Sequence, residues 1–376
     1  MAKSKFEHVK IKGIKTVIPE NYIDIDDELN FFDNNPKKLA RAKKMMGYGR
    51  RYIADENTTV VDLAVYAAEK LFLEMNYNRK EIDLLIFVNQ KPDYPEPCDA
   101  CVAHGELDLS RNCTSIDINL GCSGYVHALM TAHTYLSTGA YKKCLILAGD
   151  LCGRICTQSN RKNAPVFGDA VSATIIEYMA DASPAYFITG TDGKGWDKII
   201  RPFGGMRIPI NEKIVTEKVE NSIGNKVPLT DGIIKGEDVF NFTMEIAPKL
   251  INDIMNFTGF TSEDIDLFAI HQANKQIVEN IIDKSKIPHD KTPTETFSKY
   301  ANNSTNSVVT VLCDLPNNNL KWILLCTFGI GLSWGAAIVN VDKMYNGGIS
   351  TYIEPANKQD IKSQIDFWIK YIKGEE

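Results

Sequence analysis

The stretch Asp117-Ile-Asn-Leu-Gly-Cys-Ser-Gly-Tyr125 places a thiol between two glycines, at the point where an apolar strand gives way to a helix. If residues 123–137 form that helix, Cys122 lies at its N-terminus, where unpaired N–H groups and the helix dipole stabilise an anion. A thiolate is such an anion, so this position predicts a lowered cysteine pKa and a nucleophile. The alternative is that Cys122 is a small buried residue, as most cysteines are.

Composition limits the classes of protein to consider. The 376 residues are 44% apolar and 24% charged, which is ordinary for a globular protein with a substantial core. The net charge of −6 argues against a general nucleic-acid surface. The start of the chain is charged and no apolar run reaches the roughly 18 residues of a membrane span, so we expect a cytoplasmic location and no membrane partner.

The nine cysteines are an odd number with no regular spacing, which is typical of reduced thiols and not of a disulfide framework. Cys98-Asp-Ala-Cys101 has the spacing of a metal or redox pair. No second pair or histidine cluster follows it, and zinc commonly takes four protein ligands. We therefore expect no metal there.

Apolar runs alternate with helical patterns along the chain, which predicts an α/β fold with parallel strands. The strand candidates are 83–89, 143–149, 174–178, 265–270 and 321–328, and the helix candidates are 60–72, 123–137, 239–257, 274–283 and 307–314. The order of elements is similar in the two halves, which indicates a duplication.

Three segments stand outside this pattern. Residues 192–236 are rich in glycine and charge and are expected to form a surface excursion or a lid. Residues 33–46 are basic in an acidic protein, and residues 361–372 have an amphipathic pattern. Solvated helix faces are the ordinary explanation of the last two.

Three positions at the ends of predicted elements could meet in space. Cys122 precedes a helix, His271 follows the strand at 265–270, and Asn302 lies in an asparagine-rich turn. Each alone has an ordinary structural explanation, as a hydrogen-bonded histidine or a turn asparagine. The carboxyl ends of strands in such folds open onto one crevice, and N–H groups of the Gly329–Gly331 turn could face an oxyanion there. Together these residues predict an acyl-transfer site.

Seven motifs carry a resemblance to a known family. They are Gly47-Tyr-Gly-Arg-Arg-Tyr-Ile53, Pro92-Asp-Tyr with Pro97, Asp117 to Gly124, Phe167-Gly-Asp-Ala170, His271-Gln-Ala-Asn274, Ala301-Asn-Asn-Ser304 and Phe328-Gly-Ile-Gly-Leu-Ser-Trp-Gly-Ala336. In this order and spacing, the chain resembles a β-ketoacyl-acyl-carrier-protein synthase III, a thiolase-fold condensing enzyme, over about residues 8 to 341.

The resemblance implies a fold, partners and a chemistry. The fold is a five-layered thiolase-like α/β structure made of two duplicated βαβαβ-type halves, and the family is homodimeric. Cys122 would accept an acyl group from acyl-CoA, with the N–H groups of Cys122 and Ile330 holding the oxyanion. His271 and Asn302 would then hold the carbonyl of malonyl-acyl-carrier protein during decarboxylation. We choose Asn302 over Asn303 because the spacing to the following serines then matches. No cofactor is implied.

These halves set the expected division of the chain. Residues 1–180 form an N-terminal half with the nucleophile, and residues 181–345 form a C-terminal half with His271 and Asn302. Residues 346–376 form a C-terminal extension. The resemblance makes the Phe167–Asp169 motif structural.

Substrate contacts are where the chain departs from the family. The resemblance assigns Arg161, Asn274, Phe328 and Glu96 to substrate binding. Glu96 stands where relatives carry a bulky apolar residue that limits the acyl pocket, which favours a polar or short acyl group. Gln276 replaces an arginine that docks carrier protein or CoA, and an adenine-stacking tryptophan is missing, so this recognition differs from the family pattern.

Two alternatives stay open besides the decarboxylating synthase. An acyltransferase on the same scaffold would load Cys122 but pass the acyl group to an oxygen or nitrogen acceptor. A binding subunit without catalysis would be expected to lack part of the Cys-His-Asn set, which is complete here. A thiolase fits less well, because the glycine region at 328–334 carries no second cysteine and Cys326 precedes it within the strand.

Overall fold

Two β-sheets form the frame of the molecule. The computed structural model describes residues 1–154, 157–315, 319–356 and 358–375. The first sheet contains β2 (Val9–Ile18), β5 (Leu84–Val88), β6 (Thr114–Ile118), β7 (Lys143–Asp150), β8 (Ala170–Tyr178) and β17 (Tyr345–Thr351). Its strands lie in the order β17-β2-β8-β7-β5-β6. The three strands β6, β5 and β7 run parallel, so their carboxyl ends share one edge.

The second sheet repeats the plan of the first. It contains β1 (Ala2–Phe6), β9 (Ala185–Thr191), β14 (Leu267–Ile270), β15 (Trp322–Gly329) and β16 (Ser333–Asn340). Its run β14-β15-β16-β9 matches β5-β7-β8-β2 of the first sheet, with one parallel pair followed by two antiparallel pairs in each. This shared pattern confirms the predicted duplication, which the residues themselves do not display.

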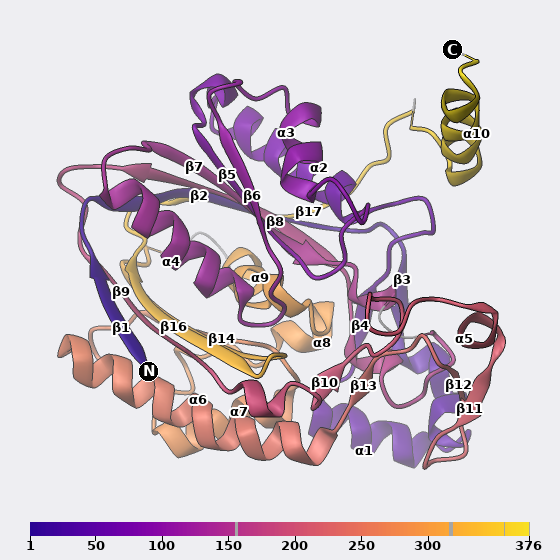
Figure 1. Cartoon of the computed structure of the whole chain (residues 1–376). Helices are drawn as coiled ribbons and strands as arrows, with labels where there is room; N and C mark the ends of the chain where they lie inside the picture. Colours follow the sequence, from indigo (N-terminus) through magenta and orange to yellow (C-terminus); the bar gives the residue numbers. More distant parts are fainter. Residues whose placement is uncertain (155–156, 316–318, 357, 376) are drawn as a thin grey trace.

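Helices occupy three layers around the two sheets (Figure 1). Between the sheets lie α4 (Gly124–Ser137) and α9 (Ser307–Asp314). The first sheet is covered outside by α2 (Val60–Glu74) and α3 (Asp99–Glu106), and the second by α6 (Gly236–Thr258) and α7 (Lys275–Ser285). The predicted five-layered α/β fold is confirmed.

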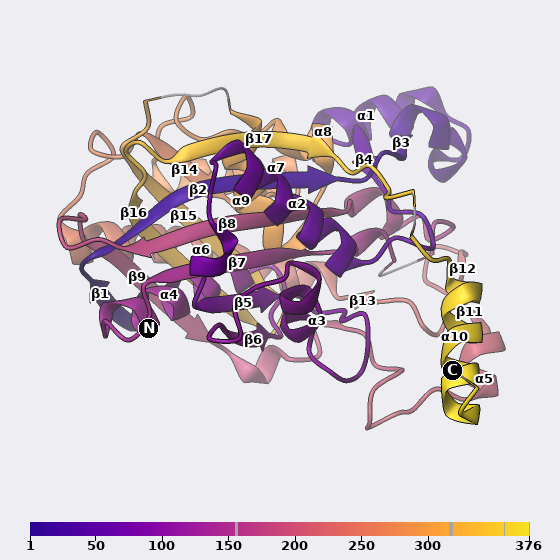
Figure 2. The ribbon, with the colours of Figure 1, turned by 90° about the horizontal axis from the view of Figure 1, so that it is seen from above.

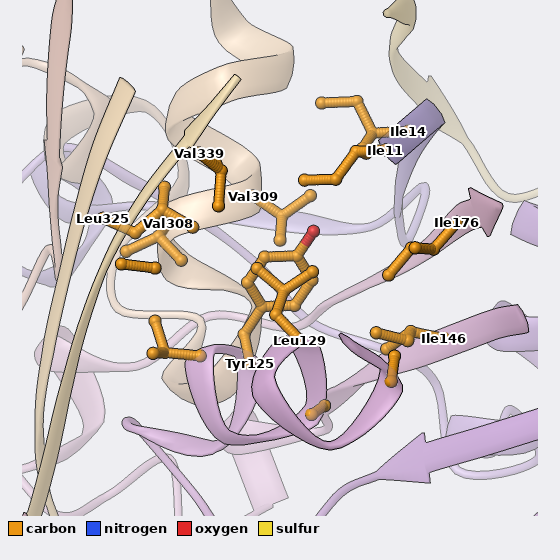
Figure 3. Packing of buried hydrophobic residues seen from close by; sticks show 14 of the residues in the cluster. Ile11, Ile14, Tyr125, Leu129, Ile146, Ile176, Val308, Val309, Leu325 and Val339 are labelled. Atoms are coloured by element: carbon orange, nitrogen blue, oxygen red, sulfur yellow. The ribbon is translucent and has the colours of Figure 1, made fainter. Parts of the chain in front are cut away.

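The central layer is packed from both sides. Figure 3 shows Tyr125 and Leu129 of α4 close to Val309 of α9, with Ile146 of the first sheet on one side and Leu325 of the second on the other. All five side chains are buried. Their burial fixes the direction of α4, whose first turn follows Cys122.

Shorter elements connect this frame. They are β3 (Tyr22–Asp24), α1 (Pro36–Met46), β4 (Arg50–Tyr52), β10 (Ile199–Ile200), α5 (Glu212–Thr216), β11 (Lys218–Glu220), β12 (Lys226–Pro228), β13 (Ile233–Ile234) and α8 (Thr296–Tyr300). The basic segment forms α1, which is capped by Asn35 and ends at Gly47. The excursion at 192–236 holds α5 and four of the short strands.

The ends of the chain cross between the halves. The N-terminal strand β1 pairs with β9 in the second sheet, while β17 joins the first sheet beside β2. The expected boundary after residue 180 falls in the loop between β8 and β9.

The amphipathic segment forms α10 (Ile361–Lys373), which buries none of its residues and stands away from the layers (Figure 2). Within the described ranges, no helix is long and apolar enough to cross a membrane.

Candidate active site

Four loops at the ends of strands and helices meet around Cys122. Cys122 lies between β6 and α4, His271 directly follows β14, Ile330 lies between β15 and β16, and Asn302 lies between α8 and α9. The loop of Cys122 belongs to the N-terminal half of the chain, and the other three loops belong to the C-terminal half. The site is therefore assembled where the two duplicated halves face each other.

The closest approach is between Gly329 and Cys122. A Cβ atom at Gly329 would lie 2.5 Å from the Cβ of Cys122 and 2.9 Å from its sulfur, so only glycine allows this contact. The backbone N–H groups of Ile330 and Cys122 both act on the sulfur. A carbonyl attached to this sulfur would therefore have two backbone donors beside its oxygen, which is the arrangement of an oxyanion hole.

Two serines hold the turn that carries Ile330. The hydroxyls of Ser123 and Ser333 are 2.6 Å apart, and the Ser333 hydroxyl donates to the carbonyl of Ile330 at 2.8 Å. Both serines are buried. This chain of hydrogen bonds links the start of α4 to the glycine turn, so the two candidate oxyanion donors are fixed relative to each other.

The thiol of Cys122 is protonated at neutral pH in the free protein. Burial raises the pKa of Cys122 to about 11, and the negative charge of Asp150 acts in the same direction. The Ser304 hydroxyl, 3.9 Å from the sulfur, and the backbone N–H groups lower the pKa but do not offset burial. The predicted lowering of this pKa is therefore wrong, because desolvation of the thiolate outweighs the donors at the helix start.

His271 is a neutral imidazole. Its side chain is buried, and burial lowers its pKa to about 4. The ring lies edge-on to Phe328, with ring centroids 5.4 Å apart. Its Nδ1 is buried without a hydrogen-bond partner among the described residues. At neutral pH the ring can donate or accept a hydrogen bond but carries no charge.

The side chains of Asn302 and Asn303 differ in what they bind. Asn303 is held at both ends of its amide, donating to the carbonyl of Tyr300 at 3.0 Å and accepting from the Thr310 hydroxyl at 3.2 Å. The Asn302 oxygen accepts from the N–H of Ser304 at 2.9 Å, and no described residue accepts from its side-chain NH₂ group. Asn302 therefore keeps free donors, which favours its choice over Asn303.

The four residues that were predicted to contact substrate differ in where the structure places them. Phe328 is buried against His271, and the Asn274 side chain caps α7 by accepting from the N–H of Ile277 at 2.9 Å. Arg161 is exposed and pairs with Asp33, in the loop before α1, at 3.4 Å. Glu96 is exposed in the loop between β5 and α3, and no described contact joins it to Cys122.

Asp169 has a structural position, as the resemblance implies. It is buried and accepts hydrogen bonds from the N–H groups of Ala54 and Gly153 at 2.8 and 2.6 Å. Sequence reasoning did not single out Lys91 and Asp150, although the charge of Asp150 acts on the Cys122 thiol and that of Lys91 acts on Asp150. The available signal was a charged side chain at, or three residues after, the end of each of two buried strands.

Comparison with known proteins gives the family. Models of 3-oxoacyl-(acyl-carrier-protein) synthase III match residues 116–193, and those of its C-terminal part match residues 255–341. A Campylobacter jejuni protein is 38% identical to this chain over 351 residues, which are 93% of this chain and 99% of that protein. Its name describes it provisionally as a 3-oxoacyl-(acyl-carrier-protein) synthase 3. The chain belongs to the 3-oxoacyl-(acyl-carrier-protein) synthase III family.

Further relatives agree with this assignment. A β-ketoacyl-(acyl-carrier-protein) synthase III of Acholeplasma laidlawii is 30% identical, with 89% of this chain and 98% of that protein covered. The crystal structure of a 3-oxoacyl-(acyl-carrier protein) synthase from Burkholderia xenovorans superposes with a TM-score of 0.84 at 30% identity. That match covers 93% of this chain and 99% of the other. The family makes this protein an enzyme of the acyltransferase and condensing type.

The raised pKa of Cys122 predicts how its alkylation depends on pH. A thiolate fraction grows about tenfold per pH unit below the pKa, so the rate of reaction with iodoacetamide should rise steadily from pH 7 to pH 10. Peptide mapping by mass spectrometry measures this rate at Cys122, and the exposed Cys101 provides an internal comparison. A rate that levels off below pH 8 would show a thiolate already formed at neutral pH.

Proposed function

We propose that this synthase III relative takes an acyl group from acyl-CoA onto Cys122 and condenses it with malonyl-acyl-carrier protein, with loss of CO₂, to give a 3-oxoacyl-carrier protein. The observation that supports this most is the packing of Gly329 on Cys122, which brings the N–H group of Ile330 to the sulfur. Membership of the family supports acyl chemistry at this residue.

In the first step, the sulfur of Cys122 attacks the thioester carbonyl of acyl-CoA. The N–H groups of Cys122 and Ile330 stabilise the negative oxygen of the tetrahedral intermediate. The bond between the carbonyl carbon and the CoA sulfur then breaks, and the proton of the Cys122 thiol ends on CoA. A neutral thiol and a neutral CoA thiol thus exchange the acyl group without net change of charge.

In the second step, the malonyl group loses its carboxylate as CO₂ and leaves an enolate on the carrier thioester. His271 and Asn302 donate hydrogen bonds to the enolate oxygen. Because burial lowers the pKa of His271 to about 4, the ring is neutral and donates an N–H group without acting as a strong acid. The enolate carbon attacks the acyl-Cys122 carbonyl. The carbon–sulfur bond to Cys122 breaks, and the departing thiolate takes up one proton.

The charged surface beside the site is proposed to dock the phosphate groups of CoA and of the carrier protein. Gln276 stands at the family's arginine position, and the neighbouring Lys275 is already paired with Glu295 at 2.8 Å. Helix α1 contacts α7 and exposes Arg41 and Lys44. Cations there would compensate for the missing arginine.

The resemblance to the family also supports a homodimer. Analytical ultracentrifugation should then give a mass twice that of one chain.

Reversing the charge of α1 tests this docking surface. The variant Arg41→Glu with Lys44→Glu should raise the KM for acyl-CoA several-fold with little change in kcat, and the effect should shrink at high salt. The variant Lys284→Glu, on the exposed end of α7, is the matched control. An unchanged KM in the α1 variant would place phosphate binding elsewhere.

Two substitutions separate the steps of the proposed reaction. Intact-mass analysis should find one acyl group added from acyl-CoA to the wild type and to Cys101→Ala, but none added to Cys122→Ala. Asn302→Ala should keep self-acylation and lose about 100-fold or more in CO₂ release from malonyl-carrier protein, because one donor to the enolate is missing. Acylation of Cys122→Ala at the wild-type level would overturn the proposal.

The same assay tests the alternative acyltransferase. An enzyme that passes the acyl group to an oxygen or nitrogen acceptor needs no malonyl group. An acyl-enzyme that forms on Cys122 but releases no CO₂ with malonyl-carrier protein would therefore favour that reaction over condensation.

A further inference from the structure

A half-buried lysine and a buried aspartate lie at the carboxyl ends of two strands of the first sheet, near the loop of Cys122. Lys91 comes three residues after β5 and Asp150 is the last residue of β7, and these strands are parallel neighbours in the first sheet. The Lys91 Nζ and one oxygen of Asp150, Oδ2, are buried without any hydrogen-bond partner among the described residues. Each of these atoms has lost its hydration without a contact that replaces it.

Three contacts connect this pair to the candidate active site. The N–H of Gln90 donates to the other oxygen of Asp150 at 2.8 Å, and the Gln90 side chain packs against Gly121, where a Cβ would lie 2.3 Å from its oxygen. The Ser304 hydroxyl acts on both Asp150 and Cys122. Gln90, the residue directly before Lys91, therefore contacts the loop that carries Cys122.

The fully buried Cys152 lies within the same cluster. Its thiol is affected by the charges of Lys91, Asp150 and Cys122 together. All four residues lie at or just beyond the carboxyl edge of the first sheet. An acyl group on the Cys122 sulfur that extends along this edge would therefore approach Lys91, Asp150 and Cys152.

No described residue accepts a hydrogen bond from the Lys91 ammonium, although the carboxylates of Asp150 and Asp169 lie close enough to raise its pKa. Asp169, which is close enough to affect Lys91, already accepts hydrogen bonds from two backbone N–H groups. Arg201 adds a second positive charge nearby. Burial lowers the pKa of Lys91 to about 8, which still leaves it mostly protonated at pH 7. An ammonium in such a place is costly unless a ligand supplies an acceptor.

We propose that Lys91 binds the far end of the acyl group carried by Cys122, and that this end is a carboxylate. The inference rests on the proposed function, because it requires an acyl group on Cys122. It names the substrate class: short acyl-CoA thioesters of dicarboxylic acids. A terminal methyl group would leave the Lys91 ammonium without a hydrogen-bond acceptor, whereas a carboxylate supplies a charged acceptor to Lys91, close to Arg201.

Three acyl-CoAs of equal length that differ in their last group test this assignment. They are succinyl-CoA with a carboxylate, butyryl-CoA with a methyl group and β-alanyl-CoA with an ammonium. Intact-mass measurement of the rate of Cys122 acylation should give succinyl-CoA an advantage of about tenfold or more over butyryl-CoA. Lys91→Met should reduce that ratio at least tenfold, Lys91→Arg should retain part of it, and the exposed Lys284→Met should leave it unchanged.

Each of the other outcomes contradicts either the inference about Lys91 or the proposed function. A wild-type preference for butyryl-CoA, or a Lys91→Met variant with slower acylation but the same ratio, would make Lys91 a structural residue and overturn the inference. A preference for β-alanyl-CoA would assign the site to Asp150 and also overturn it. If none of these nor any longer acyl-CoA acylates Cys122, the proposed function itself fails. Thermal melting of the variants separates misfolding from these effects.

Discussion

The contact of Gly329 with Cys122 is the constraint on which the site depends. A strand end of the second sheet can approach the sulfur only because residue 329 has no side chain. That approach joins the two duplicated halves across the central helices, and α4 and α9 hold the sheets at the separation it requires. Without the duplication, no loop of the second sheet would face the carboxyl edge of the first.

Burial sets the electrostatics that follow from this contact. It raises the pKa of Cys122 and lowers that of His271, so the central sulfur and imidazole are both neutral at pH 7. In such a site, fixed backbone and side-chain donors act on charge that develops during a reaction, and this action is strongest where water is excluded. Charge remains nearby on Lys91 and Asp150, and we propose that Lys91 uses it to select the acyl group.

Much of the fold was predictable because its signals are local. The long apolar strands and the periodic helices at 123–137 and 239–257 were confirmed, since periodicity reports which face of an element is buried. The crossing of β1 and β17 between the halves was not predicted, because edge pairing depends on distant residues. The pKa of Cys122 was predicted with the wrong sign, because a helix start is visible in sequence whereas the depth of burial is not.

The active-site residues could also be predicted only in part, because some contacts in the site are not visible in the sequence. Cys122 and His271 were predicted from their places beside a glycine and a strand end, and Asn302 from its asparagine-rich turn and the spacing to the following serines. The difference between Asn302 and Asn303 depends on Tyr300 and Thr310, whose hydrogen bonds no spacing reveals.

The most direct test of this account is the rate of Cys122 acylation in the variant Gly329→Ala. The added methyl group must displace the cysteine or the glycine turn, so the account predicts a folded protein whose acylation by acyl-CoA is at least about 100-fold slower. Gly193→Ala, at a position with open space around it, should acylate at the wild-type rate. Acylation of Gly329→Ala at the wild-type rate would contradict the central claim.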